Sequence, residues 1–121
     1  MIKSEFFKVQ ELVTKEMYYL YGEKCWQFID SRAILTLDQL RRVFGPLTVN
    51  DWYWGGGFTE SGVRSFDYGG ILNRSLHKFG CAFDVKSKTV TADEMRSYII
   101  NNIHEFPHLV GLEMDVDWLH F

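Results

Sequence analysis

Residues 61–85, SGVRSFDYGGILNRSLHKFGCAFDV, are the part of the chain around which we interpret the rest. Within this stretch His77 and Asp84 lie close together in sequence, and a second histidine, His120, follows near the end of the chain. Two histidines and one carboxylate are a common ligand set for a catalytic zinc ion, which keeps a fourth position for water. We therefore expect these three side chains to form a metal site.

The backbone has to turn for these side chains to converge. Residues an odd number of positions apart face opposite sides of a strand, so His77 and Asp84 need a turn between them. Gly80 permits one, because glycine readily adopts positive φ. Asp117 and His120 face the same restriction, and we expect Asp117 in a turn or bulge before the strand that carries His120. An unligated carboxylate there is a candidate base for a metal-bound water.

The composition predicts one globular domain over residues 1–121. A chain of this length can bury a core without disulfide or metal staples. Hydrophobic residues make up 46% and charged residues 24%, as in ordinary soluble proteins, whereas the aromatic share of 17% is high. A net charge of −3 lacks the basic field of nucleic-acid binders, so we expect no nucleic-acid partner.

The N-terminal sequence MIKSEFFKVQELV lacks the apolar core of a signal peptide, and no apolar run approaches a membrane span. We therefore expect synthesis in the cytoplasm without a signal peptide and no membrane partner. Cys25 and Cys81 are far apart and form no CxxC pair, which predicts two reduced thiols. A metal contact of Cys81 stays open as an alternative.

Hydrophobic periodicity predicts two helices and a strand in the first half of the chain. Apolar residues recur at three- and four-residue spacing over 3–21, which is typical of an amphipathic helix. A second helix is expected from Thr36 or Leu37 to Gly45-Pro46, where glycine and proline end it. A strand is expected over 47–54.

In the second half, residues 55–72 form a long polar loop, and 81–85 alternate as a strand. A helix over 92–103 is expected, with Thr91 and a glutamate three residues later as a capping box. Residues 109–121 are expected to form two short strands. The fold class that follows is α+β, with a small, mainly antiparallel sheet flanked by about three helices.

Three motifs resemble one family. Residues 75–84, SLHKFGCAFD, resemble the SxHxxGxAxD signature of the zinc peptidases that cleave D-Ala-D-Ala and related cell-wall links. That family includes D-alanyl-D-alanine carboxypeptidases and dipeptidases and phage L-alanyl-D-glutamate endolysins, within the superfamily of lysostaphin-type enzymes and the hedgehog domain. Residues 61–65, SGVRS, resemble its SGxRS element, and 117–120, DWLH, resemble its closing [DE]xxH. The resemblance spans roughly residues 30–121.

The resemblance implies a hedgehog/D-Ala-D-Ala-peptidase-like fold that binds one Zn²⁺. It implies His77, Asp84 and His120 as the zinc ligands. It implies Asp117 as the general base, although many family members carry glutamate at that position.

Two further residues carry roles by resemblance. Arg64 is implied to orient the substrate and to stabilise the developing oxyanion, since a fixed guanidinium pairs with a carboxylate or a carbonyl oxygen. Ser75 is implied as a substrate-binding or loop-supporting residue.

These implications predict a metallopeptidase that hydrolyses peptide bonds in peptidoglycan stem peptides, as a carboxypeptidase or an endopeptidase, with no protein partner. Its place of action would be the cell wall. Without a signal peptide or a wall-binding domain, a phage or prophage endolysin or a virion-associated hydrolase fits better than a secreted enzyme. The alternative is a catalytically inactive, zinc-containing structural or wall-binding module, such as a phage virion component. The presence of Asp117 and Arg64 favours the enzyme.

Overall fold

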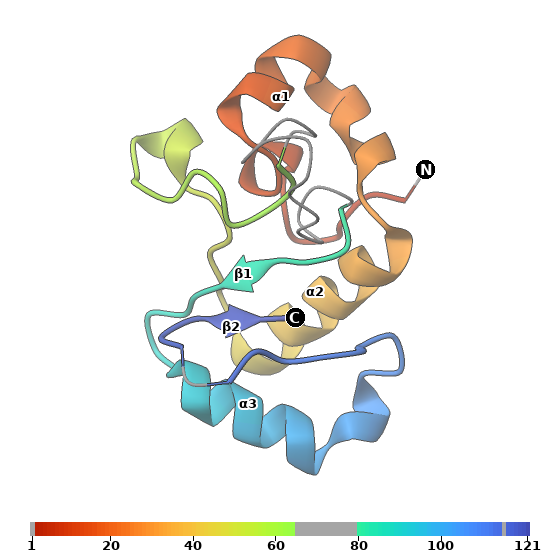
Figure 1. Cartoon of the computed structure of the whole chain (residues 1–121), viewed down its shortest axis with the longest axis vertical. Coiled ribbons are helices and arrows are strands. Elements are labelled where there is room, and N and C mark those ends of the chain that lie inside the picture. The colour runs from red at the N-terminus through yellow and green to blue at the C-terminus, as the bar shows by residue number, and fades with distance from the viewer. Residues whose placement is uncertain (1, 65–79, 115) are drawn as a thin grey trace.

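The computed structural model of the chain describes residues 2–64, 80–114 and 116–121. Its regular elements are α1 (Lys15–Tyr21), α2 (Ser31–Phe44), β1 (Asp84–Val85), α3 (Ala92–Asn101) and β2 (Leu119–His120). The two strands pair antiparallel, and Figure 1 shows them in the middle of the molecule, between α3 on one side and α1 on the other. In its described part the chain is thus a mainly helical α+β structure with a small antiparallel sheet.

Helix α2 begins at Ser31, five residues before the expected start at Thr36. The Asp30 side chain accepts a hydrogen bond from the backbone N–H of Arg32 at 2.8 Å, which satisfies one of the free N–H groups of the first turn. The same carboxylate binds the Arg32 guanidinium at 2.9 Å. The helix ends as expected at Gly45, whose φ of 80° suits glycine.

Replacing Asp30 by alanine should lower the free energy of unfolding by about 1 kcal/mol at neutral pH, the usual effect of losing a helix cap. The hydrogen bond from the Arg32 side chain holds the pKa of Asp30 below its usual value. Because the folded-state pKa is lowered, the stabilisation is complete above the unfolded-state value of about 3.9 and is lost as pH falls through the folded-state value.

Denaturant unfolding across this acidic range measures the free energy of unfolding of the wild-type and Asp30→Ala proteins. The difference between the two values should decrease as pH falls. Asp30→Asn is the matched control, since asparagine also caps helices and should retain most of the stability. A pH-independent difference between wild type and Asp30→Ala would contradict the role of the carboxylate.

The expected helix over 3–21 was wrong in its first half. Only α1 is α-helical there, preceded by a 3₁₀ turn over Val9–Glu11. The Ser4 hydroxyl accepts hydrogen bonds from two backbone N–H groups, and the Thr14 hydroxyl accepts one from Met17 as the cap of α1. Such local bonds from serine and threonine compete with a continuous helix and divide the segment into shorter pieces.

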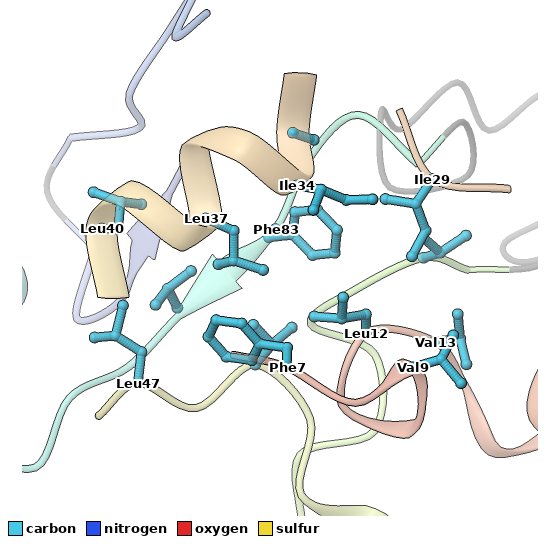
Figure 2. Packing of buried hydrophobic residues seen from close by; sticks show 14 of the residues in the cluster. Phe7, Val9, Leu12, Val13, Ile29, Ile34, Leu37, Leu40, Leu47 and Phe83 are labelled. Atoms are coloured by element: carbon cyan, nitrogen blue, oxygen red, sulfur yellow. The ribbon is translucent and has the colours of Figure 1, made fainter. Parts of the chain in front are cut away.

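The hydrophobic core joins α2, the N-terminal segment and β1. In Figure 2, Ile34 and Leu37 of α2 lie beside Phe83, and Phe7 and Leu12 approach from the opposite side. All but Phe7 are fully buried, and the rest of the cluster extends to α3 and β2. Because side chains alternate along a strand, this burial directs the neighbour of Phe83 in β1 away from the core.

The expected strand over 47–54 was also wrong. Only Thr48 bridges to Lys86, through two backbone hydrogen bonds of 2.8 and 2.9 Å. Beyond it, the Asp51 side chain accepts a hydrogen bond from the N–H of Phe58, while its main-chain carbonyl accepts from the N–H groups of Trp54 and Gly56 around the 3₁₀ turn Trp52–Trp54. These local bonds to one residue provide an alternative to strand pairing.

The capping box of α3 is present as expected. Thr91 accepts a hydrogen bond from the N–H of Glu94, whose carboxylate accepts one from the N–H of Thr91. The helix ends at Asn101, two residues before the expected end, and a 3₁₀ turn over Ile103–Glu105 follows. In the described part of 109–121, β2 is the one strand, where two were expected.

None of the helices in the described ranges is both long and apolar enough to span a membrane. No disulfide joins Cys25 to Cys81.

Candidate functional site

The strand pair places Asp84 directly opposite His120. Phe83 and Phe121, one position further along, exchange two backbone hydrogen bonds of 3.2 Å. In an antiparallel pair the next facing residues then form a non-hydrogen-bonded pair, whose side chains lie closer together. Oδ1 of Asp84 accordingly lies 2.6 Å from Nδ1 of His120, with both side chains largely buried. The fold thus brings together two of the three candidate ligands.

Arg64 lies on the other side of Asp84. Its Nη2 atom is 3.9 Å from Oδ2 of Asp84, and its Nε donates to the carbonyl oxygen of Glu60 at 2.8 Å. The Arg64 side chain is 18% exposed, so it is less accessible to water than the side chain of a surface arginine. The sequence-predicted group for orienting a substrate therefore lies next to a predicted ligand.

The backbone before Arg64 is fixed between two segments. Val63 donates its N–H to the carbonyl oxygen of Leu12 at 2.7 Å, and Ser61 accepts from the N–H of Asp84 at 2.8 Å. A Cβ atom at Gly62 would lie 2.1 Å from the Leu12 oxygen. Glycine is therefore required in the SGVRS motif, because the chain passes directly against the backbone of Leu12.

The Lys86 side chain also binds this segment, a role that the sequence did not indicate. Its Nζ donates to the carbonyl oxygen of Val49 at 2.8 Å and to the hydroxyl of Ser61 at 2.5 Å. The ammonium also lies 4.1 Å from the ring centroid of Phe58. Burial lowers the pKa of Lys86 to about 8, since it disfavours the charged form.

Gly80 adopts the turn that the sequence predicts, with φ of 68°. A Cβ atom there would lie 1.9 Å from the carbonyl oxygen of Phe28, so an L-residue is excluded by contact as well as by φ. The carbonyl of Gly80 accepts a hydrogen bond from Asp30, which anchors the start of β1 to α2. The predicted ligand His77 and the predicted substrate-binding Ser75 lie outside the described residues.

His120 is held in a negative environment. The hydrogen bond to the Asp84 carboxylate raises the pKa of His120, and the charges of Asp84 and Glu113 act in the same direction. Burial and the charge of Arg64 act against them. A cation that binds Nδ1 therefore competes with a proton whose binding the Asp84 hydrogen bond favours.

Glu113 is the residue near this pair that sequence reasoning missed. Its Oε2 atom lies 4.0 Å from Nδ1 of His120, and its N–H donates to the His120 carbonyl oxygen at 3.0 Å. The six residues between them give no local signal, because the contact arises only when the chain before β2 brings Glu113 back to His120.

Asp117 lies in a bend before β2, as expected. It is exposed and lines a cavity of about 290 Å³ beside the start of α3, together with Lys86 and Arg96. Among the described residues, no hydrogen bond or ion pair links Asp117 to Asp84 or His120. The structure thus places the predicted base in the loop before His120, as an exposed residue at the edge of the α3 cavity.

A carboxylate oxygen and an imidazole nitrogen at this separation suit zinc, which binds both atom types. In the described ranges no group of three or more His, Cys, Asp or Glu side chains is arranged to hold a metal ion. The described donors fit two of the three protein ligands of a catalytic zinc site. Comparisons with models of protein families, with curated proteins and with solved structures find no match for this chain.

Proposed function

We propose that this chain is a zinc metallopeptidase that hydrolyses peptide bonds in the stem peptides of peptidoglycan. The observation that carries the proposal is the opposed pair of Asp84 and His120, with the Arg64 guanidinium 3.9 Å from the carboxylate. All three residues belong to motifs that resemble the cell-wall zinc peptidases. The resemblance adds His77 as the third ligand and a hedgehog/D-Ala-D-Ala-peptidase-like fold.

Each residue has a defined part in this chemistry. His77, Asp84 and His120 would hold a zinc ion, which lowers the pKa of its bound water to about 7 and polarises the scissile carbonyl. An oxygen of Asp117 would accept the proton of the water and pass it to the leaving amine. The guanidinium of Arg64 would donate hydrogen bonds to a substrate carboxylate or to the developing oxyanion.

The substrate-binding role of Ser75, a hydroxyl donor to the bound peptide, also comes from the motif. The chain would act on the bacterial cell wall, as a phage or prophage endolysin or a virion-associated hydrolase. Its macromolecular partner is the peptidoglycan itself.

The proposal is tested on the whole chain with zinc supplied. Synthetic stem peptides and purified peptidoglycan should each yield the two fragments of one hydrolysed peptide bond, identified by mass spectrometry. A chelator should stop the reaction, and added zinc should restore it. Elemental analysis should find about one zinc per chain, as expected for three protein ligands and a water. Absence of both zinc and cleavage would refute the proposal.

A second candidate is an inactive, zinc-containing module that binds the wall. The position of Asp117 favours it, because among the described residues no hydrogen bond or ion pair joins this exposed residue to Asp84 or His120. Retention on purified peptidoglycan with zinc bound and no soluble product would support this candidate. Release of peptide fragments would exclude it.

A further inference from the structure

We propose that Glu113 is a positioning residue of the metal site: its charge increases the affinity of the face around His120 for a divalent cation. The inference rests on the proposed function, since it concerns the same site. Nδ1 of His120 lies 2.6 Å from Oδ1 of Asp84 and 4.0 Å from Oε2 of Glu113. One ring nitrogen therefore faces two carboxylates that come from different parts of the chain.

The backbone of Glu113 is held on both sides. Its N–H donates to the carbonyl oxygen of His120 at 3.0 Å, and its own carbonyl accepts from Nη1 of Arg96 at 3.5 Å. The side chain is 51% exposed, so its carboxylate has room to turn toward a bound cation. The backbone position of Glu113 is thus fixed, while its carboxylate can change orientation.

The local charges explain the effect on a cation. Among the described residues, the Glu113 carboxylate adds a negative charge 4.0 Å from Nδ1 of His120, opposite in sign to the Arg64 guanidinium that lies 3.9 Å from Asp84. Replacing this carboxylate by an amide removes one charge that attracts a dication and leaves the other described charges as they are. Groups outside the ligand set that tune a metal in this way typically change its affinity by about 10- to 100-fold.

Glu16 provides a matched comparison. It carries the same charge on the same type of side chain, is exposed in the first turn of α1, and is not among the charges that act on His120. A change of charge at Glu16 should therefore leave the affinity of the His120 face nearly unaltered. The contrast between the two acidic residues separates a local effect from a general effect of net charge.

The experiment measures the zinc dissociation constant of the full chain by competition with a chromophoric chelator, for wild type, Glu113→Gln and Glu16→Gln. Glu113→Gln should weaken zinc binding by about tenfold or more, whereas Glu16→Gln should stay close to wild type. The effect of Glu113→Gln should shrink as salt is added, because screening weakens charge interactions at partly exposed sites. A merely structural role would not depend on salt in this way.

Glu113→Asp keeps the charge on a shorter side chain and should recover part of the zinc affinity. This variant also tests the inference if Glu113→Gln does not fold. Equal zinc affinity of wild type and Glu113→Gln would overturn the inference while the proposed function stands. Equal weakening by Glu16→Gln would overturn it as well. If wild-type protein binds no zinc, the proposed function fails and the inference fails with it.

Discussion

Replacing His120 by alanine should abolish zinc binding and lower the rate of stem-peptide hydrolysis by about a thousandfold or more. The substitution removes the imidazole that faces Asp84 across the strand pair, and with it one of the proposed ligands. Metal ions contribute several kcal/mol to such reactions, and about 4 kcal/mol corresponds to roughly a thousandfold in rate. Elemental analysis and a discontinuous peptide assay measure the two effects.

The matched control is His104→Ala, which removes an exposed histidine from the turn after α3. It should leave zinc content and rate unchanged. His77→Ala should behave like His120→Ala, because the motif implies the same role for both. Near wild-type activity of His120→Ala, with circular dichroism showing a folded protein, would remove the basis of the proposed site.

Helix ends were predictable where a local signal marks them. The Thr91 capping box and the glycine stop of α2 depend on residues within a few positions of one another, and both are present. The start of α2 at Ser31 was missed because the helix was expected to begin at Thr36 or Leu37, without Asp30 as its cap. The apolar pattern of a helix predicts which face is buried, but it does not predict the residue at which the helix begins.

Segments whose polar side chains bind their own backbone were predicted poorly. Hydrophobic spacing over 3–21 fits a helix, yet the Ser4 and Thr14 hydroxyls break it into a 3₁₀ turn and a short α1. Likewise, the Asp51 side chain accepts a hydrogen bond from the N–H of Phe58, and a 3₁₀ turn stands where a strand was expected. Periodicity records which side chains can be buried, whereas these bonds decide how the backbone satisfies its own donors.

The candidate site shows the same difference between local signals in the sequence and contacts between distant residues. The motifs identified Asp84, His120 and Arg64, which the described structure brings together. The strand register that opposes the first two, and the return of Glu113 to the same place, depend on residues far apart in sequence. Neither follows from spacing, because a register is set by the packing of both strands on the core.

Arg96 shows how an apparently ordinary surface residue can hold the site together. It belongs to α3, but its side chain is 4% exposed. Its Nη atoms donate to the carbonyl oxygens of Glu113, Val116 and Trp118 at 2.9–3.5 Å. The loop that leads into β2 is therefore folded around a single guanidinium.

Replacing Arg96 by methionine should lower the free energy of unfolding by about 3 kcal/mol, because three carbonyl oxygens lose a charged donor and each such hydrogen bond contributes about 1.5–3 kcal/mol. The whole cost is not additive, since the loop can open and let water reach them. For a chain of this size the loss corresponds to a fall in Tm of roughly 10 °C. Thermal and denaturant unfolding of the zinc-free protein measure it.

Arg96→Lys should recover only part of this stability, since lysine keeps the charge but lacks the planar set of donors that reaches several carbonyls at once. Arg42→Met is the control for removing an arginine from an exposed ion pair, here with Glu5, and should cost at most about 1 kcal/mol. If Arg96→Met proves no more destabilising than Arg42→Met, the loop before β2 is held by its other contacts. If it is strongly destabilising, zinc affinity should fall with it, because the loop that Arg96 orders leads directly into His120.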